Sequence, residues 1–121
     1  MPLKLSTRTI DDVSIVDCSG RIVFGDEASA LREAVKGLLD RPRSIVINLE
    51  QVNYIDSGGL GTLVGLYTSA RNSGGNISLA CLNNRVIDLL QVTKLLTVFE
   101  VHDAVEKAVA AHKSGETAGA A

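Results

Sequence analysis

One short stretch, Asp56-Ser57-Gly58-Gly59-Leu60, combines residue types that could carry chemistry. A serine hydroxyl is a nucleophile when a neighbouring base activates it, and Asp-Ser-Gly-Gly is the kind of string that surrounds a protease nucleophile. The same string is also typical of a strand that turns into a helix and presents one hydroxyl to solvent. The question is whether Ser57 attacks a substrate or is itself acted upon.

A hydrolytic role for Ser57 needs a base and an oxyanion hole. A chymotrypsin-like enzyme needs two β-barrels, about twice the length of this 121-residue chain. The Gly-x-Ser-x-Gly turn of α/β-hydrolases is absent, because Ile55 stands where that turn has glycine. Neither His102 nor His112 is placed by the sequence to serve Ser57, although a Ser57–His102 dyad stays open. No metal-ligand spacing and no Gly-Lys-Ser/Thr phosphate loop is present, so we expect no cofactor.

The hydrophobic pattern around this stretch predicts alternating strands and helices. The predicted order is a β-hairpin (3–10 and 13–18), a helix (25–39), a buried strand (44–50), a helix (60–71), a strand (76–82), a short helix (83–90), a strand (95–101) and a last helix after Asp103. Such alternation implies right-handed crossovers and a mostly parallel sheet. The fold class is therefore α/β, a single domain with a mixed sheet, an N-terminal β-hairpin and about four helices.

In such a sheet, the loops that leave the carboxyl ends of the parallel strands meet at one edge, where open α/β sheets bind other molecules. We predict that loops 24–26, 51–59 and 82–85 meet there, with Ser57 in the middle loop. Asp56 or Ser57 should cap the helix that follows.

The surface around the Ser57 hydroxyl is predicted to be apolar and bare, which would let a partner approach it closely. The residues of this rim are Tyr54, Ile55, Gly58, Gly59 and Leu60. Gly61 and Gly65 lie four residues apart on the same helix. We predict that they face the sheet, where missing side chains permit close packing.

Composition narrows the functional classes further. Twelve basic and fourteen acidic residues give a net charge of −2, which argues against direct binding of nucleic acid. No apolar stretch approaches the roughly 20 residues needed to span a bilayer, so we expect a cytoplasmic protein without membrane insertion. Cys18 and Cys81 are expected to be free thiols in the core. Residues 1–113 are predicted to form the domain, and 114–121 a disordered tail.

From about Gly20 to Val109, the chain resembles the STAS domain of bacterial anti-sigma factor antagonists. The features that carry the resemblance are Asp56-Ser57-Gly58-Gly59-Leu60-Gly61 after a buried strand, the Gly74-Gly75 break, and "LLQVTKLLTVFEV" near the end. The resemblance implies a STAS (SpoIIAA-like) fold and no enzymatic activity. It implies that Ser57 is a phosphorylation site. The unphosphorylated protein would bind an anti-sigma factor that is itself a serine kinase, and a serine phosphatase would reset the switch.

The same resemblance places the partner-binding surface around Ser57. We expect it to comprise Tyr54, Asp56, Gly58, Gly59 and Leu60, together with Phe24, Asp26 and Asn84 from the neighbouring loops. Many family members have an acidic residue after the second strand, where this chain has Val23 and Phe24. Asp26 or Glu27, which follow a few residues later, would substitute for that residue. A buried Phe24 is the commoner outcome, and an exposed one would indicate a more apolar contact.

Two other functions stay open from the sequence. The first is a STAS scaffold or an accessory subunit of a signalling complex or membrane transporter, in which Ser57 is never phosphorylated. The second is the serine hydrolase considered above. The sequence predicts neither the oligomeric state nor the identity of the sigma factor.

Overall fold

The computed structural model describes residues 3–38 and 44–120, with side chains up to residue 113. Its elements follow in the order β1 (Lys4–Ile10), β2 (Val13–Ile22), α1 (Asp26–Lys36), β3 (Ser44–Ile55), α2 (Ser57–Asn72), β4 (Asn76–Ala80), α3 (Asn84–Val92), a 3-10 turn η1 (Leu95–Thr97), β5 (Glu100–His102) and α4 (Val105–Ala120). The five strands form one sheet in the order β1-β2-β3-β4-β5. The predicted α/β class is confirmed.

The sheet is antiparallel only at its first pair. β1 and β2 form the predicted hairpin, and both residues of its turn, Asp11 and Asp12, have positive φ, as a tight hairpin turn requires. β2, β3, β4 and β5 pair in parallel, as the alternation of strands and helices predicted.

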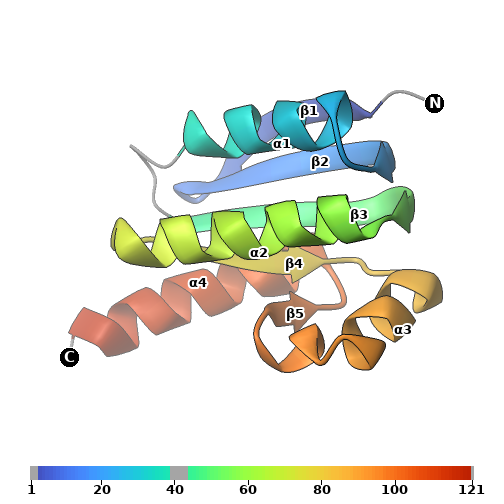
Figure 1. Cartoon of the computed structure of the whole chain (residues 1–121). Helices are drawn as coiled ribbons and strands as arrows, with labels where there is room; N and C mark the ends of the chain where they lie inside the picture. Colours follow the sequence, from blue (N-terminus) through green and yellow to red (C-terminus); the bar gives the residue numbers. More distant parts are fainter. Residues whose placement is uncertain (1–2, 39–43, 121) are drawn as a thin grey trace.

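Helices cover both faces of the sheet (Figure 1). α1 and α2 lie in front of it and α4 lies behind it. The side chains of β3 alternate accordingly: Ile45 and Ile47 are buried in the larger core with α1 and α2, and Val46 is buried in the smaller core with α4. No helix in the described part of the chain is both long and apolar enough to cross a membrane.

Several strand boundaries differ from the prediction. β2 continues to Ile22 instead of stopping at Cys18, and β4 ends at Ala80 instead of Leu82. β3 continues to Ile55 instead of stopping at Glu50. The two strands stay paired as far as Ile22 and Ile55 because β3 has one more residue than β2 at each of two irregularities in the register. The predicted loop 51–59 is thereby reduced to Asp56 between β3 and α2. Residues 95–97, predicted as strand, form the 3-10 turn η1, and only Glu100–His102 pairs with β4.

The helix ends also show where sequence patterns are informative. Gly74 has positive φ, and the Gly75 N–H donates to the Ala70 carbonyl at 2.7 Å, so the two glycines end α2 as predicted. α1 ends at Lys36, before the predicted end at Leu39, which lies outside the described residues.

α4 has helical backbone through residues 114–120, where the sequence predicts a disordered tail. The domain boundary at 113 stays a prediction.

The prediction for Gly61 and Gly65 is wrong. Both glycines are exposed, and a Cβ built on either would meet no atom within 4 Å. They therefore do not pack on the sheet, and nothing within the described chain needs them to be glycine. Each glycine costs the helix about 1 kcal/mol relative to alanine.

Candidate functional site

Ser57 is the first residue of α2, and its side chain is exposed. Asp56 is the N-cap, so the uncertainty in the sequence between Asp56 and Ser57 is resolved in favour of Asp56. Among the described residues, the Ser57 hydroxyl has no hydrogen-bond partner. Ser57 thus lies at the positive end of the helix dipole with an oxygen that the fold does not use.

The Asp56 carboxylate joins two loops at this edge. One oxygen accepts a hydrogen bond from the Gly59 N–H at 2.7 Å, and both oxygens accept from the Phe24 N–H at 3.1 Å. These donors hold the pKa of Asp56 below its usual value, the Gly59 N–H most strongly. Through these hydrogen bonds, the charged Asp56 carboxylate holds the β2–α1 loop against the start of α2.

Gly58 and Gly59 are required by this close approach. A Cβ on Gly58 would lie 2.5 Å from the Cβ of Phe24, and a Cβ on Gly59 would collide with the Ile22 carbonyl. Neither glycine has positive φ, so the reason is contact and not backbone conformation. The first turn of α2 rests directly on the end of β2.

Phe24 and Tyr54 supply the apolar surface next to Ser57. Phe24 is 81% exposed and Tyr54 is 42% exposed. Phe24 thus shows the less common of the two expected outcomes, and its exposed ring indicates an apolar contact surface. The guanidinium of Arg21 lies 5.1 Å from the centre of the Tyr54 ring, within cation–π distance. Sequence reasoning missed Arg21, because only the strand register brings it beside Tyr54.

The predicted rim needs one correction. Ile55, Gly59 and Leu60 are buried, because their side chains or backbone pack into the core beneath the first turn of α2. They support the surface from below and are not open to direct contact in this structure. The exposed or half-exposed part of the predicted rim is Tyr54 and Gly58, on either side of the exposed Ser57 in the sequence.

The two remaining predicted contact residues, Asp26 and Asn84, are both exposed and both begin helices. Asp26 lies in the first turn of α1. Asn84 opens α3, whereas its neighbour Asn83 caps that helix and donates from its side chain to the Val52 carbonyl of β3 at 2.7 Å. No described contact joins Asn84 to Ser57. Within the third predicted loop, it is therefore Asn83 and not Asn84 whose side chain contacts the neighbouring strand β3.

The histidines are engaged elsewhere. His112 is 5% exposed on α4, and its Nε2 lies 2.8 Å from the hydroxyl of the buried Ser78 on β4. His102 lies on β5, with its Nε2 3.9 Å from a Glu100 carboxylate oxygen. Within the described part of the chain, neither histidine contacts Ser57, so the predicted alternative of a Ser57–His102 dyad is not formed in this structure. No cluster of metal-ligating side chains occurs in the described ranges.

Comparison with known proteins gives concordant matches. The STAS domain family matches residues 4–108. The anti-sigma-B factor antagonist of Bacillus subtilis is 34% identical over 74 residues, which cover 61% of this chain and 68% of that protein. The crystal structure of a candidate anti-sigma factor antagonist from Thermotoga maritima superposes with a TM-score of 0.82 at 25% identity, covering 90% of this chain and 94% of that one.

More distant structures share the fold alone. They include the Bacillus protein SpoIIAA, unphosphorylated and phosphorylated, with TM-scores of 0.70 and 0.69 at 15% identity; the matches cover 93% and 88% of this chain and 99% and 96% of those chains. A sulfate transporter family protein from Wolinella succinogenes also matches, with a TM-score of 0.69 at 23% identity, covering 84% of each chain. Because the family match spans most of the sequence and the sheet and helices agree with it, the chain belongs to the STAS domain family.

Proposed function

We propose that this protein is an anti-sigma factor antagonist that binds an anti-sigma factor with serine kinase activity when Ser57 is unphosphorylated, and releases it when Ser57 is phosphorylated. The observation that carries the proposal is the exposed Ser57 hydroxyl, which makes no hydrogen bond within the described chain and lies at the start of α2 beside exposed Phe24. The antagonist from Bacillus subtilis supports the assignment. A serine phosphatase would return the protein to its binding form.

The physical consequence of phosphorylation differs between the fold and the interface. A phosphate adds about −1.5 to −2 charge. In the free protein the helix dipole favours it by about 0.3–1 kcal/mol, and repulsion from the Asp56 carboxylate acts against that gain. In a docked interface the same group must lose its water or face like charge, which costs several kcal/mol. Each 1.4 kcal/mol changes affinity about tenfold, so binding should respond far more than stability.

The experiment starts from purified anti-sigma factor kinases encoded in the source genome. Each is incubated with this protein and ATP, and the phosphate is mapped by mass spectrometry. We expect modification at Ser57, none in Ser57→Ala, and binding by Ser57→Ala as tight as that of the wild type. Phosphate on another residue, with Ser57 unmodified, would contradict the proposal.

The charge mechanism is tested with two variants of equal charge. Ser57→Asp should weaken binding at least about tenfold, with little change in melting temperature. Thr9→Asp is the matched control, because Thr9 is exposed on β1 and lies outside the proposed surface. Equal binding by Ser57→Asp and Thr9→Asp would reject the mechanism.

A further inference from the structure

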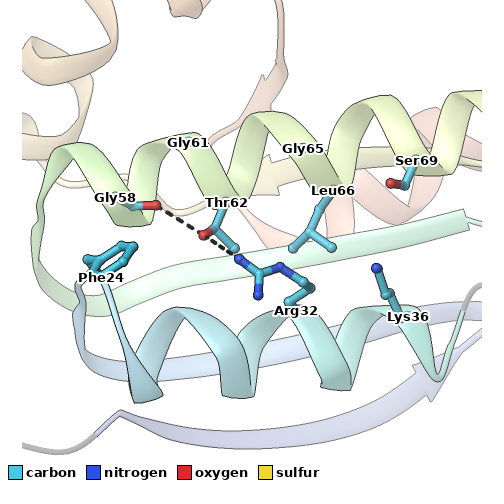
Figure 2. A pocket seen from close by; sticks show the side chains of 9 residues that line it. All are labelled: Phe24, Arg32, Lys36, Gly58, Gly61, Thr62, Gly65, Leu66 and Ser69. Carbon is cyan, nitrogen blue, oxygen red and sulfur yellow. Dashed lines mark hydrogen bonds between the residues drawn. The ribbon is translucent and has the colours of Figure 1, made fainter.

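An open groove runs between α1 and α2 (Figure 2). One end of it lies at Phe24 and Gly58, and Gly58 directly follows Ser57 in the sequence. Its volume is about 330 Å³. Arg32 and Lys36 of α1 form one wall, Gly61, Thr62 and Gly65 of α2 form part of the other, and Phe24 lies at one end. The residues that line the groove include no acidic side chain.

The two charged side chains that line this groove, Arg32 and Lys36, are both positive. Arg32 and Lys36 are four residues apart on one face of α1, an arrangement in which like charges disfavour a helix. Arg32 is oriented across the groove, where its guanidinium donates to the Thr62 hydroxyl at 3.4 Å. In a chain of net charge −2, this groove is a local positive surface. It is electrostatically complementary to an acidic partner segment.

The shape of the groove fits a helix better than a small ligand. It follows α2 from Gly58 to Ser69, which is about 16 Å at 1.5 Å per residue, or about three turns. It is open along its length, whereas small-molecule sites enclose most of the ligand surface. The exposed Gly61 and Gly65 leave room for another backbone to lie close to α2.

We propose that this groove receives an acidic helix of the anti-sigma factor. The inference rests on the proposed function, because the groove ends at Phe24 and Gly58, next to Ser57. It also deepens the switch. A phosphate on Ser57 would place about two negative charges at the mouth of a groove that holds an acidic segment. Like-charge repulsion then adds to desolvation in expelling the partner.

The test uses the anti-sigma factor kinase that binds the wild-type chain, with affinity measured by calorimetry. Lys36→Glu should weaken binding at least about tenfold, and Lys4→Glu, the same charge change at an exposed position on β1, should have little effect. Gly65→Leu fills the groove and should also weaken binding about tenfold. Ala30→Leu is its control, because Ala30 is exposed on α1 and does not line the groove.

Melting temperatures verify that all four variants fold, and raised salt should weaken wild-type binding. If Ser57→Asp weakens binding while Lys36→Glu and Gly65→Leu do not, the groove proposal is wrong and the proposed function stands. If no anti-sigma factor binds the wild-type chain, both are wrong. If Gly65→Leu instead alters self-association in sedimentation experiments, the occupant is a second copy of this chain and the proposal is overturned.

Discussion

Two glycines on the same helix, Gly59 and Gly61, should respond to alanine substitution with opposite signs. In Gly59→Ala the new methyl group collides with the Ile22 carbonyl, a backbone atom that also accepts from the Asp56 N–H at 3.2 Å. Overpacking costs about 1–3 kcal/mol, and loss of that hydrogen bond adds about 0.5–1.5 kcal/mol. The gain in helix propensity offsets about 1 kcal/mol. We expect a net loss of about 0.5–3.5 kcal/mol.

Gly61→Ala should instead stabilise the protein. Its Cβ meets nothing within 4 Å, so only the propensity gain of about 1 kcal/mol remains. For a chain of 121 residues, 1 kcal/mol corresponds to about 3–6 °C in melting temperature. Gly59→Ala should therefore melt about 2–20 °C below the wild type, and Gly61→Ala about 3–6 °C above it.

The assay is thermal and urea unfolding followed by far-ultraviolet circular dichroism, since the chain has no tryptophan to report by fluorescence. Gly65→Ala serves as a replicate of Gly61→Ala, because its Cβ also meets nothing within 4 Å. Shifts of the same sign for Gly59→Ala and Gly61→Ala would refute the packing described for the first turn of α2.

Three further measurements address other parts of the fold. The Arg8 guanidinium, 2.8 Å from Asp17, is the main reason that the pKa of Asp17 lies below its usual 3.8. Asp17 should therefore add stability above about pH 3.8 that is lost on further acidification, and urea titrations at different pH should show this loss in the wild type but not in Asp17→Asn. Burial raises the pKa of the Cys18 thiol to about 12, so iodoacetamide at pH 8 should label native protein at the half-buried Cys81 first and both thiols only after unfolding. Asn83→Ala removes the α3 cap and a bond to β3, and should cost about 1–2 kcal/mol in urea unfolding.

The sequence predicted the architecture because its signals are periodic and local. The β-branched run of β3, the apolar face of α2 and the Gly74-Gly75 stop each depend on neighbours within one or two turns or strand positions. The position of Ser57 followed directly, since the residue after a parallel strand at a helix start lies at the carboxyl edge of the sheet.

What the sequence did not predict depends on contacts between distant residues. The exposure of Phe24 follows from its bond to Asp56, 32 residues away, which holds the loop over Gly58. The outward direction of Gly61 depends on how α2 is rotated against the sheet, and a glycine carries no hydrophobic signal of its own. The burial of His112 depends on its contact with Ser78, which lies on another element. Such contacts leave no periodic trace in the sequence.

The site separates two kinds of residue that are adjacent in the chain. Asp56 and Gly59 are engaged by the fold, through the capping bond and through contact with β2, so substitutions there alter stability and the position of Phe24 together. The Ser57 side chain takes part in neither the capping hydrogen bond nor the contact with β2. A phosphate can therefore be added to it without disturbing the sheet. A residue that controls binding in this way must lie where the fold is rigid but must not contribute to that rigidity. Loss of binding in an Asp56 variant would therefore not identify a contact residue unless its melting temperature were unchanged, whereas loss of binding in Ser57→Asp with wild-type stability would.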